Sequence, residues 1–316
     1  MTFINAINKR LWYLALLSIL CSFISLGGSQ FWFLDLFSHF QLQYLIIMIL
    51  ASLSMILCRD WKKVLICSLG SLFSIWMLLT HTHAPSSQLD SSTSTSIKML
   101  QFNVNTSNTK YSKLIELIQK ENPDLVLLIE LNKAWSQNLR PLESIYPYQI
   151  QRIRSDNFGI KLYSKKAFVN QSIVSFSDLN LPSIHASIEF EGKQLEIIGT
   201  HAIPPINKRY WQDRNKHLSR IAEKAKQTDD PLIVVGDLNI TAWSPSFAQI
   251  TEGDVLQVSV IDTLLTPSWP SFFPPLWIPI DHVLFNKGVQ SVIRSYPETT
   301  DLGSDHIPIM MEISLR

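Results

Sequence analysis

The stretch PLIVVGDLN, residues 231–239, decides the fold of this 316-residue chain. Its apolar half has the length and composition of a buried strand, so Asp237 and Asn239 should lie where that strand emerges into a loop. Side chains held at a strand end have a rigid sheet behind them, as metal-assisted hydrolysis requires. The stretch therefore predicts one strand and part of one site.

Four more stretches have the same build, with an amide, an acid or an imidazole at the end of an apolar run. They are MLQFNVN (99–105), PDLVLLIE (123–130), LEIIGTH (195–201) and GSDHIPIMMEISL (303–315). A single polar residue at a strand end is usually a turn or a cap. Five such stretches in succession instead predict a shared active site.

With Pro279-Ile-Asp281 included, the polar residues follow the order Asn, Glu, His, Asp-x-Asn, Asp, Ser-Asp-His. In this order residues 97–316 resemble the endonuclease/exonuclease/phosphatase superfamily, which includes DNase I-like nucleases, inositol-phosphate phosphatases and neutral sphingomyelinases. Thr200-His201 before Pro204-Pro205, and Trp243-Ser244-Pro245 after GDLN, are most similar to its bacterial membrane-anchored members. The resemblance implies an α/β fold, a four-layer αββα sandwich whose motifs converge at one edge.

The catalytic residues that the resemblance implies are His201, Asp237, Asn239, Asp281 and His306. Asp237 is expected to orient and activate the attacking water, with Asn239 donating a hydrogen bond to the water or the transition state. His306 is expected to contact a phosphoryl oxygen or transfer a proton, and Asp281 to fix its tautomer. His201 is expected to bind the phosphate or assist the leaving group.

The resemblance also implies a cofactor, Mg²⁺ or Mn²⁺, which hard oxygen ligands select. Glu130 is expected to be a metal ligand, and Asp305 to be a second metal-site or water-binding carboxylate. Several nucleases of the group have an acid at the position of Asn105. The choice between one and two metal ions therefore stays open.

Three residues are expected to bind substrate: Asn103, Asn105 and Arg214. Asn103 would position the phosphate or a metal-bound water. Arg214 matches a helix position of the bacterial subgroup, although an external ion pair explains it equally well. It belongs to a cluster with Lys208, Arg209, Lys216 and Arg220 that is either a local basic patch or a solvated helix face.

The first 83 residues are predicted to be a transmembrane region. Apolar stretches at 11–26, 42–58 and 64–80 approach the roughly 20 residues that cross a bilayer. A cleaved signal peptide is the alternative for the first stretch, because Ser25–Ser29 resembles a cleavage site. Residues 84–96 are Ser/Thr-rich and predict a flexible linker to a catalytic domain at 97–316.

The cations of this region predict its orientation. Lys9 and Arg10 precede the first span, and Arg59, Lys62 and Lys63 lie between the second and third, whereas the loop with Asp35 and His39 has no Lys or Arg. By the positive-inside rule the catalytic domain lies outside, in the periplasm of a bacterium with two membranes. The expected location is thus a bacterial inner membrane, with several spans.

Charge and cysteine content narrow the function further. From residue 97 onward there are 22 Lys and Arg against 23 Asp and Glu, a formal charge of −1, which argues against a large nonspecific nucleic-acid surface. The three cysteines all fall in the predicted spans, so the domain has no disulfide or cysteine metal site.

Periodicity places the domain's elements. Strands are predicted at 98–104, 125–130, 183–190, 194–200, 231–236, 279–285 and 306–315, and helices at 110–120 and 207–226. Gly192 should turn an antiparallel hairpin between the third and fourth of these strands.

The sequence as a whole predicts a membrane-anchored, divalent-metal-dependent phosphodiesterase, possibly an endonuclease, acting on the outer side of the membrane. The alternatives are a lipid phosphodiesterase of the sphingomyelinase type, a phosphatase, and an inactive binding protein. The substrate would be nucleic acid or phospholipid, and no obligate protein partner is expected. The aromatic loop 269–277 would touch lipid, stack on bases, or pack on the domain.

Overall fold

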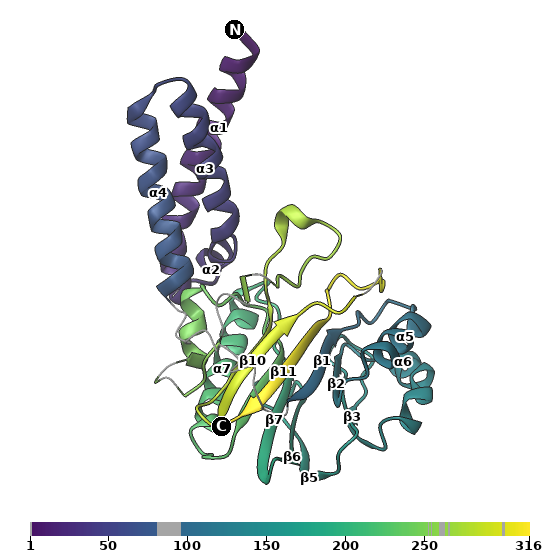
Figure 1. Cartoon of the computed structure of the whole chain (residues 1–316). Coiled ribbons are helices and arrows are strands. Elements are labelled where there is room, and N and C mark those ends of the chain that lie inside the picture. The colour runs from purple at the N-terminus through teal and green to yellow at the C-terminus, as the bar shows by residue number, and fades with distance from the viewer. Residues whose placement is uncertain are drawn as a thin grey trace. The chain divides into compact units, whose positions relative to one another are not determined.

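A computed structural model describes residues 2–80, 96–251, 253, 255–258, 263–264, 266–298 and 301–316. The chain forms two compact units (Figure 1). One unit contains the N-terminal helices together with Ile240–Ala248, and the other contains both β-sheets. The predicted linker, 84–96, lies outside the described residues except for Ser96.

The helical unit is built from apolar helices. They are α1 (Thr2–Ile24), the 3-10 turn η1 (Ser25–Ser29), α2 (Trp32–Ser38), α3 (Gln41–Leu57) and α4 (Trp61–Thr80). Two stretches, Ala6–Ser29 and Trp61–Leu79, are long and apolar enough to cross a membrane, and α2 with α3 gives a third candidate bent by 54°. The three predicted spans fall on these three segments, and their crossing of a membrane stays a prediction.

The side chains of these helices explain why they suit a membrane. Small or flexible residues, among them Ala15, Ala51 and Met48, are buried between the helices. Leu17 and Leu72 are more than half exposed on the outside. A helix that is apolar on its outer face as well as its inner face needs an apolar surrounding.

The second unit contains two mixed sheets. The first has strand order β10-β11-β1-β2-β4-β3 and the second β5-β6-β7-β8-β9; the pairs β1–β2 and β7–β8 are parallel and the others antiparallel. The strands of the first sheet are β1 (Ile97–Asn103), β2 (Leu125–Ile129), β3 (Tyr148–Arg152), β4 (Ile160–Ser164), β10 (Val289–Ser295) and β11 (Ile309–Leu315). Those of the second are β5 (Phe168–Val174), β6 (Ser183–Phe190), β7 (Lys193–His201), β8 (Leu232–Asp237) and β9 (Asp281–Phe285).

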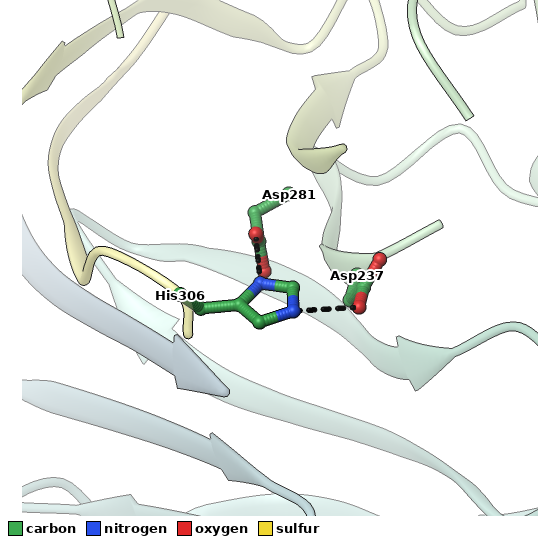
Figure 2. A group of neighbouring side chains, drawn as sticks. All are labelled: Asp237, Asp281 and His306. Carbon is green, nitrogen blue, oxygen red and sulfur yellow. Dashed lines mark hydrogen bonds and ion pairs between the residues drawn. The ribbon is translucent and has the colours of Figure 1, made fainter. Parts of the chain in front are cut away.

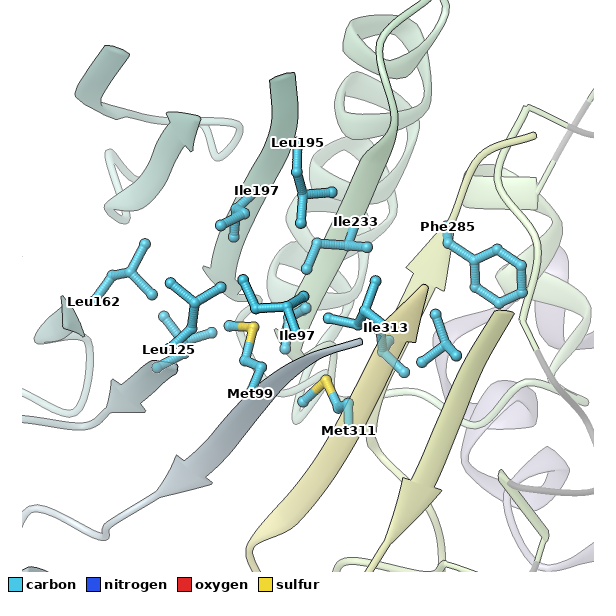
Figure 3. Close-up of a cluster of buried hydrophobic side chains, with 14 of the residues drawn as sticks. Ile97, Met99, Leu125, Leu162, Leu195, Ile197, Ile233, Phe285, Met311 and Ile313 are labelled. Carbon is cyan, nitrogen blue, oxygen red and sulfur yellow. The ribbon is translucent and has the colours of Figure 1, made fainter. Parts of the chain in front are cut away.

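The sheets share one apolar core (Figure 3). Side chains alternate between the two faces of a strand, so every second residue of a central strand enters this core. Ile97 and Met99 enter it from β1, and Ile233 and Val235 enter it from β8. This alternation fixes which residues at the strand ends face the other sheet.

Helices form the outer layers. Leu100 and Phe102, on the other face of β1, pack with Leu114 of α5 (Tyr111–Glu121) and Trp135 of α6 (Lys133–Asn138). On the second sheet, helix α7 (Lys208–Ala225) is joined to β7 by a hydrogen bond of 2.7 Å between His217 and Thr200. The predicted four-layer αββα sandwich is confirmed.

The remaining short elements of the described chain are η2 (Arg140–Ser144), η3 (Pro245–Phe247), α8 (Ala248–Thr251) and η5 (Pro274–Leu276). The predicted hairpin at Gly192 is confirmed, since Phe190 pairs with Lys193 across it. Strands β3, β4, β5 and β10 and helix α6 were not predicted. Three of these strands, β3, β5 and β10, lie at sheet edges, and β3 and β5 have no buried residue. Strand β4 buries a lysine, Lys161, over the ring of Tyr163 at 4.2 Å.

Candidate active site

Four polar residues continue the inner face of the sheets past the end of the apolar core. Asn103 of β1, His201 of β7, Asp237 of β8 and Asp281 of β9 stand two or four residues from core side chains on the same strand face. Because β7 and β8 are parallel and β9 is antiparallel to them, His201, Asp237 and Asp281 lie in register across the second sheet. The site is therefore the polar edge of the core between the sheets.

His306 occupies the middle of this edge (Figure 2). Its Nδ1 lies 2.7 Å from Oδ2 of Asp281, and its Nε2 lies 3.6 Å from Oδ2 of Asp237. All three side chains are buried. The imidazole is thus held between two carboxylates from neighbouring strands, with the first contact far tighter than the second.

His201 approaches Asp237 from β7. Its Nε2 lies 3.5 Å from Oδ2 of Asp237, and its ring lies 4.9 Å from the ring of Phe158. Oδ2 of Asp237 therefore lies near two imidazole rings, those of His201 and His306.

Asn103 joins Glu130 to this centre. Its amide nitrogen lies 3.0 Å from Oε1 of Glu130, 3.4 Å from Asp237 and 3.3 Å from Nε2 of His306. Glu130 also accepts a hydrogen bond from the backbone N–H of Thr106. The structure thus brings Glu130 to the same edge as the two aspartates.

Asn105 and Asp305 form the outer side of the site. The amide of Asn105 donates to Oδ1 of Asp305 at 2.8 Å, and the indole N–H of Trp269 donates to Oδ2 at 3.1 Å. Asp305 and His306 line an open cavity of about 800 Å³ together with Asn105, Ser271 and Phe272. The cavity therefore reaches the buried centre at His306.

Asn239 lies beyond Asp237 on the turn after β8. Its backbone N–H donates to Oδ1 of Asp237 at 2.8 Å, and its side-chain amide donates to the carbonyl of Ala202 at 2.9 Å. Arg214, from α7, is fully buried and donates to the carbonyl of Asn239 at 3.1 Å. Substrate binding by Arg214 stays a prediction; in this structure its guanidinium holds the turn.

The backbone is constrained at these strand ends. Asn105, Glu130 and Asn239 have φ of +60°, +64° and +50°, a region that L-residues enter at a cost. Gly236 precedes Asp237 with φ +147°, and a Cβ there would lie 1.8 Å from the carbonyl oxygen of Thr200. The glycine of the GDLN motif is required by this close approach of β8 to β7.

The pKa values of His306 and Asp281 are shifted in opposite directions. Burial lowers the pKa of His306, but Asp281 and Asp237 outweigh it and raise that pKa to about 10. Burial raises the pKa of Asp281, but His306 and the hydrogen bond from Gln101 outweigh it and lower that pKa to about 2. At neutral pH the pair is an imidazolium and a carboxylate.

The pKa values of the other acids and of the other histidine shift in the opposite directions. Burial and the charge of Asp281 raise the pKa of Asp237, and burial raises the pKa of Glu130. Burial and the nearby His306 lower the pKa of His201 to about 4, so this imidazole is neutral at pH 7. A divalent cation would favour the ionised forms of both carboxylates.

The donor set fits such a cation. Asp237, Asp281 and His306 offer ligand atoms within 4.8 Å of one another, which is a possible metal group among the described residues. His306 is a poor ligand while Nδ1 faces Asp281 and the ring is protonated, because an imidazolium has no free lone pair. Carboxylate and amide oxygens remain, and these are the ligands of hard cations.

Two residues of the site were missed in the sequence. The amide of Gln101 donates to Oδ1 of Asp281 at 2.7 Å, and the hydroxyl of Ser268 accepts from the backbone N–H of Asp281 at 3.1 Å. Gln101 could have been found, because it is two residues before Asn103 on the inner face of an otherwise apolar strand. Ser268 has no such signal.

Two mixed sheets packed as a sandwich, with acids, amides and imidazoles gathered at one edge of the core, define the DNase I-like class of proteins. The chain belongs to the endonuclease/exonuclease/phosphatase family, whose model matches residues 100–306. No curated protein sequence matches the chain significantly.

Solved structures agree on the fold. Truncated TDP2 from Caenorhabditis elegans superposes with a TM-score of 0.59 at 13% identity, covering 69% of this chain and 98% of that one. TDP2 from D. rerio, complexed with a single-strand DNA product, gives 0.57 at 19% identity, covering 70% and 99%. Sphingomyelinase C from Streptomyces griseocarneus gives 0.54 at 19% identity, covering 69% and 99%.

Proposed function

We propose that the chain is a membrane-anchored phosphodiesterase that depends on Mg²⁺ or Mn²⁺. The observation that carries this proposal is the ion pair of His306 and Asp281 beside Asp237, at the edge of the core and next to an open cavity. Phosphoester hydrolysis needs positive charge at the phosphoryl oxygens and an oriented water. The imidazolium of His306 supplies the positive charge, and Asp237 orients the water.

Asp237 acts on the attacking water. A base works best when its pKa is near the working pH, and burial with Asp281 shifts the pKa of Asp237 upward in that direction. Asn239 fixes this carboxylate through its backbone N–H, and its side-chain amide lies 3.4 Å from Nε2 of His201. These two residues place and deprotonate the water.

The two histidines have different tasks. His306 carries a positive charge and two N–H donors, so it binds a phosphoryl oxygen and can return a proton to the leaving group. His201 is neutral and binds the phosphate through a hydrogen bond without adding charge. Asp281 keeps His306 protonated and oriented.

Glu130 and Asp305 would hold the divalent cation, with Asn103 beside Glu130. When bound, the cation supplies charge that stabilises the phosphoryl oxygens in the transition state. Asn105 takes one oxygen of Asp305 as a hydrogen-bond acceptor, where an acid would have offered another ligand. This favours a site for one ion.

The test uses the full-length protein in detergent with bis(p-nitrophenyl) phosphate. Hydrolysis should appear with Mg²⁺ or Mn²⁺, vanish with a chelator, and return on adding the metal. Hydrolysis that survives complete chelation would contradict the metal dependence. No hydrolysis of any phosphodiester, together with retained metal binding, would favour an inactive binding protein.

We also propose that the domain lies on the outer side of the membrane. Support comes from the helical unit, where Lys63 lies over the ring of Trp12 at 5.5 Å, so the cations of α1 and of the α3–α4 turn share one end. That end is cytoplasmic by the positive-inside rule. Reporter fusions after α4 and in the α3–α4 turn should give opposite locations, and equal ones would overturn this orientation.

A lipid phosphodiester is the favoured substrate class. Three residues of the loop 269–277 are well exposed, Phe272 at 77%, Phe273 at 46% and Leu276 at 43%, and Phe272 lines the cavity beside the site. For these residues the expectation of packing on the domain is wrong. Exposed aromatic side chains at a cavity suit an amphiphilic ligand.

The predicted basic cluster gives little support to nucleic acid. Lys216 and Arg220 pair with Asp178 at 2.8 and 2.6 Å, and Arg214 is buried. Hydrolysis of sphingomyelin or phosphatidylcholine in vesicles, compared with single-stranded DNA, RNA and a phosphomonoester, decides between the classes. Faster cleavage of the nucleic acids would favour a nuclease, and of the monoester a phosphatase.

A further inference from the structure

The chain leaves the active-site turn and enters the helical unit within one peptide bond. Asp237 and Asn239 belong to the sheet unit, whereas the next nine residues, Ile240–Ala248, are grouped with the N-terminal helices. The chain then returns to the sheet unit at Gln249. Neither residue type nor periodicity predicted this exchange.

Polar side chains of α2 and of the residue that follows it hold the inserted segment. The hydroxyl of Ser244 donates to Oδ1 of Asp35 at 2.6 Å. Nδ1 of His39 lies 3.1 Å from the hydroxyl of Thr241 and 3.4 Å from its backbone N–H. These bonds connect residues about two hundred positions apart.

The backbone carbonyls of His39 and Gly28 also accept hydrogen bonds from the inserted segment. The indole N–H of Trp243 donates to the carbonyl of His39, and the hydroxyl of Ser246 donates to the carbonyl of Gly28, both at 3.1 Å. A Cβ at Gly28 would lie 3.0 Å from Cα of Asp35, which is tighter than an ordinary van der Waals contact, so the backbones pack closely here. The segment is thus bonded at four of its residues, Thr241, Trp243, Ser244 and Ser246.

These hydrogen bonds matter for stability because their donors and acceptors are buried. Asp35 is fully buried and His39 is 7% exposed, and Thr241 and Ser244 are fully buried. A buried carboxylate or imidazole is costly unless it is hydrogen-bonded, and removing one partner leaves the other unsatisfied. The helical unit therefore holds the segment in one conformation.

The turn just before the inserted segment is held by contacts within the sheet unit. Arg214 donates to the carbonyl of Asn239, the group that forms the peptide bond with Ile240. The φ of Asn239 is +50°, a conformation that persists only where the surroundings impose it. Asn239 is therefore held within the sheet unit, and the peptide bond that follows it leads directly into the segment that His39 holds within the helical unit.

We propose that Asp35 and His39 are positioning residues for the active site, acting through Thr241 and Ser244 on the turn that carries Asp237 and Asn239. The helical unit is then part of the catalytic apparatus as well as an anchor. This inference rests on the proposed function for its catalytic half. Its structural half, the hold on Ile240–Ala248, is measurable without any substrate.

The experiment uses full-length protein in detergent with four single variants. Asp35→Ala removes the hydrogen bond to Ser244, and His39→Ala removes the one to Thr241. Asp35→Asn keeps the Oδ1 acceptor, and Gln41→Leu is the matched control. Gln41 is buried in the same unit, but its hydrogen bonds go to Ser22, Ser25 and Ser74. Amide hydrogen exchange over 238–248 and the kcat and KM for the phosphodiester are measured on each.

Both alanine variants should speed exchange over 238–248 and lower kcat at least about tenfold with KM nearly unchanged, since small misplacements of catalytic groups are costly. Asp35→Asn should restore both, and Gln41→Leu should change neither. The double variant of Asp35→Ala with Ser244→Ala should be no worse than Asp35→Ala alone. If kcat fell as far in Gln41→Leu as in the two alanine variants, the loss would come from general destabilisation of the helical unit, and the proposal would be overturned.

Unchanged exchange in both alanine variants would overturn the hold itself. Faster exchange with unchanged kcat would overturn the positioning role. If the wild-type protein cleaves no phosphodiester, the proposed function fails, and with it the catalytic half of this inference. In that case exchange over 238–248 still decides whether Asp35 and His39 hold the segment.

Discussion

Two of the histidine–carboxylate contacts described in the sheet unit are short and have the same chemistry, but they lie on different faces of the strands. His306 and Asp281 meet at 2.7 Å on the inner edge of the core, and their side chains are 6% and 1% exposed. His185 and Glu196 meet at 2.9 Å on paired strands β6 and β7, with exposures of 24% and 13%. The distances hardly differ, so distance alone does not distinguish an active-site pair from a structural one.

The faces of the strands explain the difference. Ile184 and Ala186 of β6 enter the core, so His185 points to the outer face among hydroxyl and amide side chains. Asp281 is on the inner face, where His306 meets a second carboxylate, Asp237, and solvent is excluded. Alternation along a strand thus decides which pair is strongly coupled.

The largest expected contrast is in catalysis. Asp237→Asn and His306→Gln should each lower kcat by about 10² to 10⁴, the usual contribution of a general acid or base. His185→Gln should leave kcat within about twofold of wild type, because the pair it breaks contacts no reacting group. Steady-state kinetics on bis(p-nitrophenyl) phosphate measures all three, and a large loss in His185→Gln would erase the distinction.

The second contrast is in the pH dependence of stability. The pKa of His306 is raised to about 10 from its usual 6.5, so the folded protein keeps a proton that the unfolded chain releases. Stability should therefore be fully present below pH 6.5 and fall between pH 6.5 and 10, by up to about 1.4 kcal/mol per pH unit.

Unfolding midpoints measured in chelator across this pH range check the prediction. His306→Gln should flatten the decline, whereas His185→Gln should keep it. The depressed pKa of Asp281, about 2, adds a separate loss of stability as the pH falls below 4 toward that value. An unchanged decline in His306→Gln would mean that another group releases the proton.

A smaller contrast concerns the amides beside each pair. Gln101 donates to Asp281 at 2.7 Å, and Gln194 donates to Ser187, near His185, at 2.8 Å. Gln101→Leu should lower kcat about tenfold, because Asp281 loses a charge-assisted bond worth about 1.5 to 3 kcal/mol. Gln194→Leu should have no effect on kcat, and equal losses would contradict a special role for the inner edge.

The smallest expected effect is on stability at the outer pair. Partly exposed ion pairs contribute about 0 to 1 kcal/mol, so His185→Gln should shift the unfolding midpoint only slightly at pH 7. Chemical denaturation with and without high salt measures this change. A larger loss would place His185 and Glu196 among the strongly coupled groups.

Much of the sandwich could be predicted because its central strands are buried on both faces. Continuous apolar runs such as LIVV at 232–235 are recognisable without any partner strand. The edge strands β3 and β5 gave no such signal, since most of their residues face solvent. Their pairing is imposed by the neighbouring strand, which a local pattern does not contain.

The site divides in the same way. Asn103 and Asp237 were found as polar ends of apolar runs, a local signal. The pairing of His306 with Asp281 was expected only through the family resemblance, because no local spacing encodes how distant strands and loops meet. The hydrogen bond from Ser244 to Asp35 had no signal of either kind. The buried state of Arg214, expected to reach substrate, likewise follows from the packing of α7.

The inserted segment has a consequence for assembly. Asp35 and Ser244 are 209 residues apart, so the helical unit acquires its last contacts only after most of the chain has been made. Contacts of such long sequence separation form slowly, because the entropy of closing the loop is lost before they are gained. The helical unit, whose helices precede the sheet unit in the chain, is therefore among the last parts of the protein to be finished.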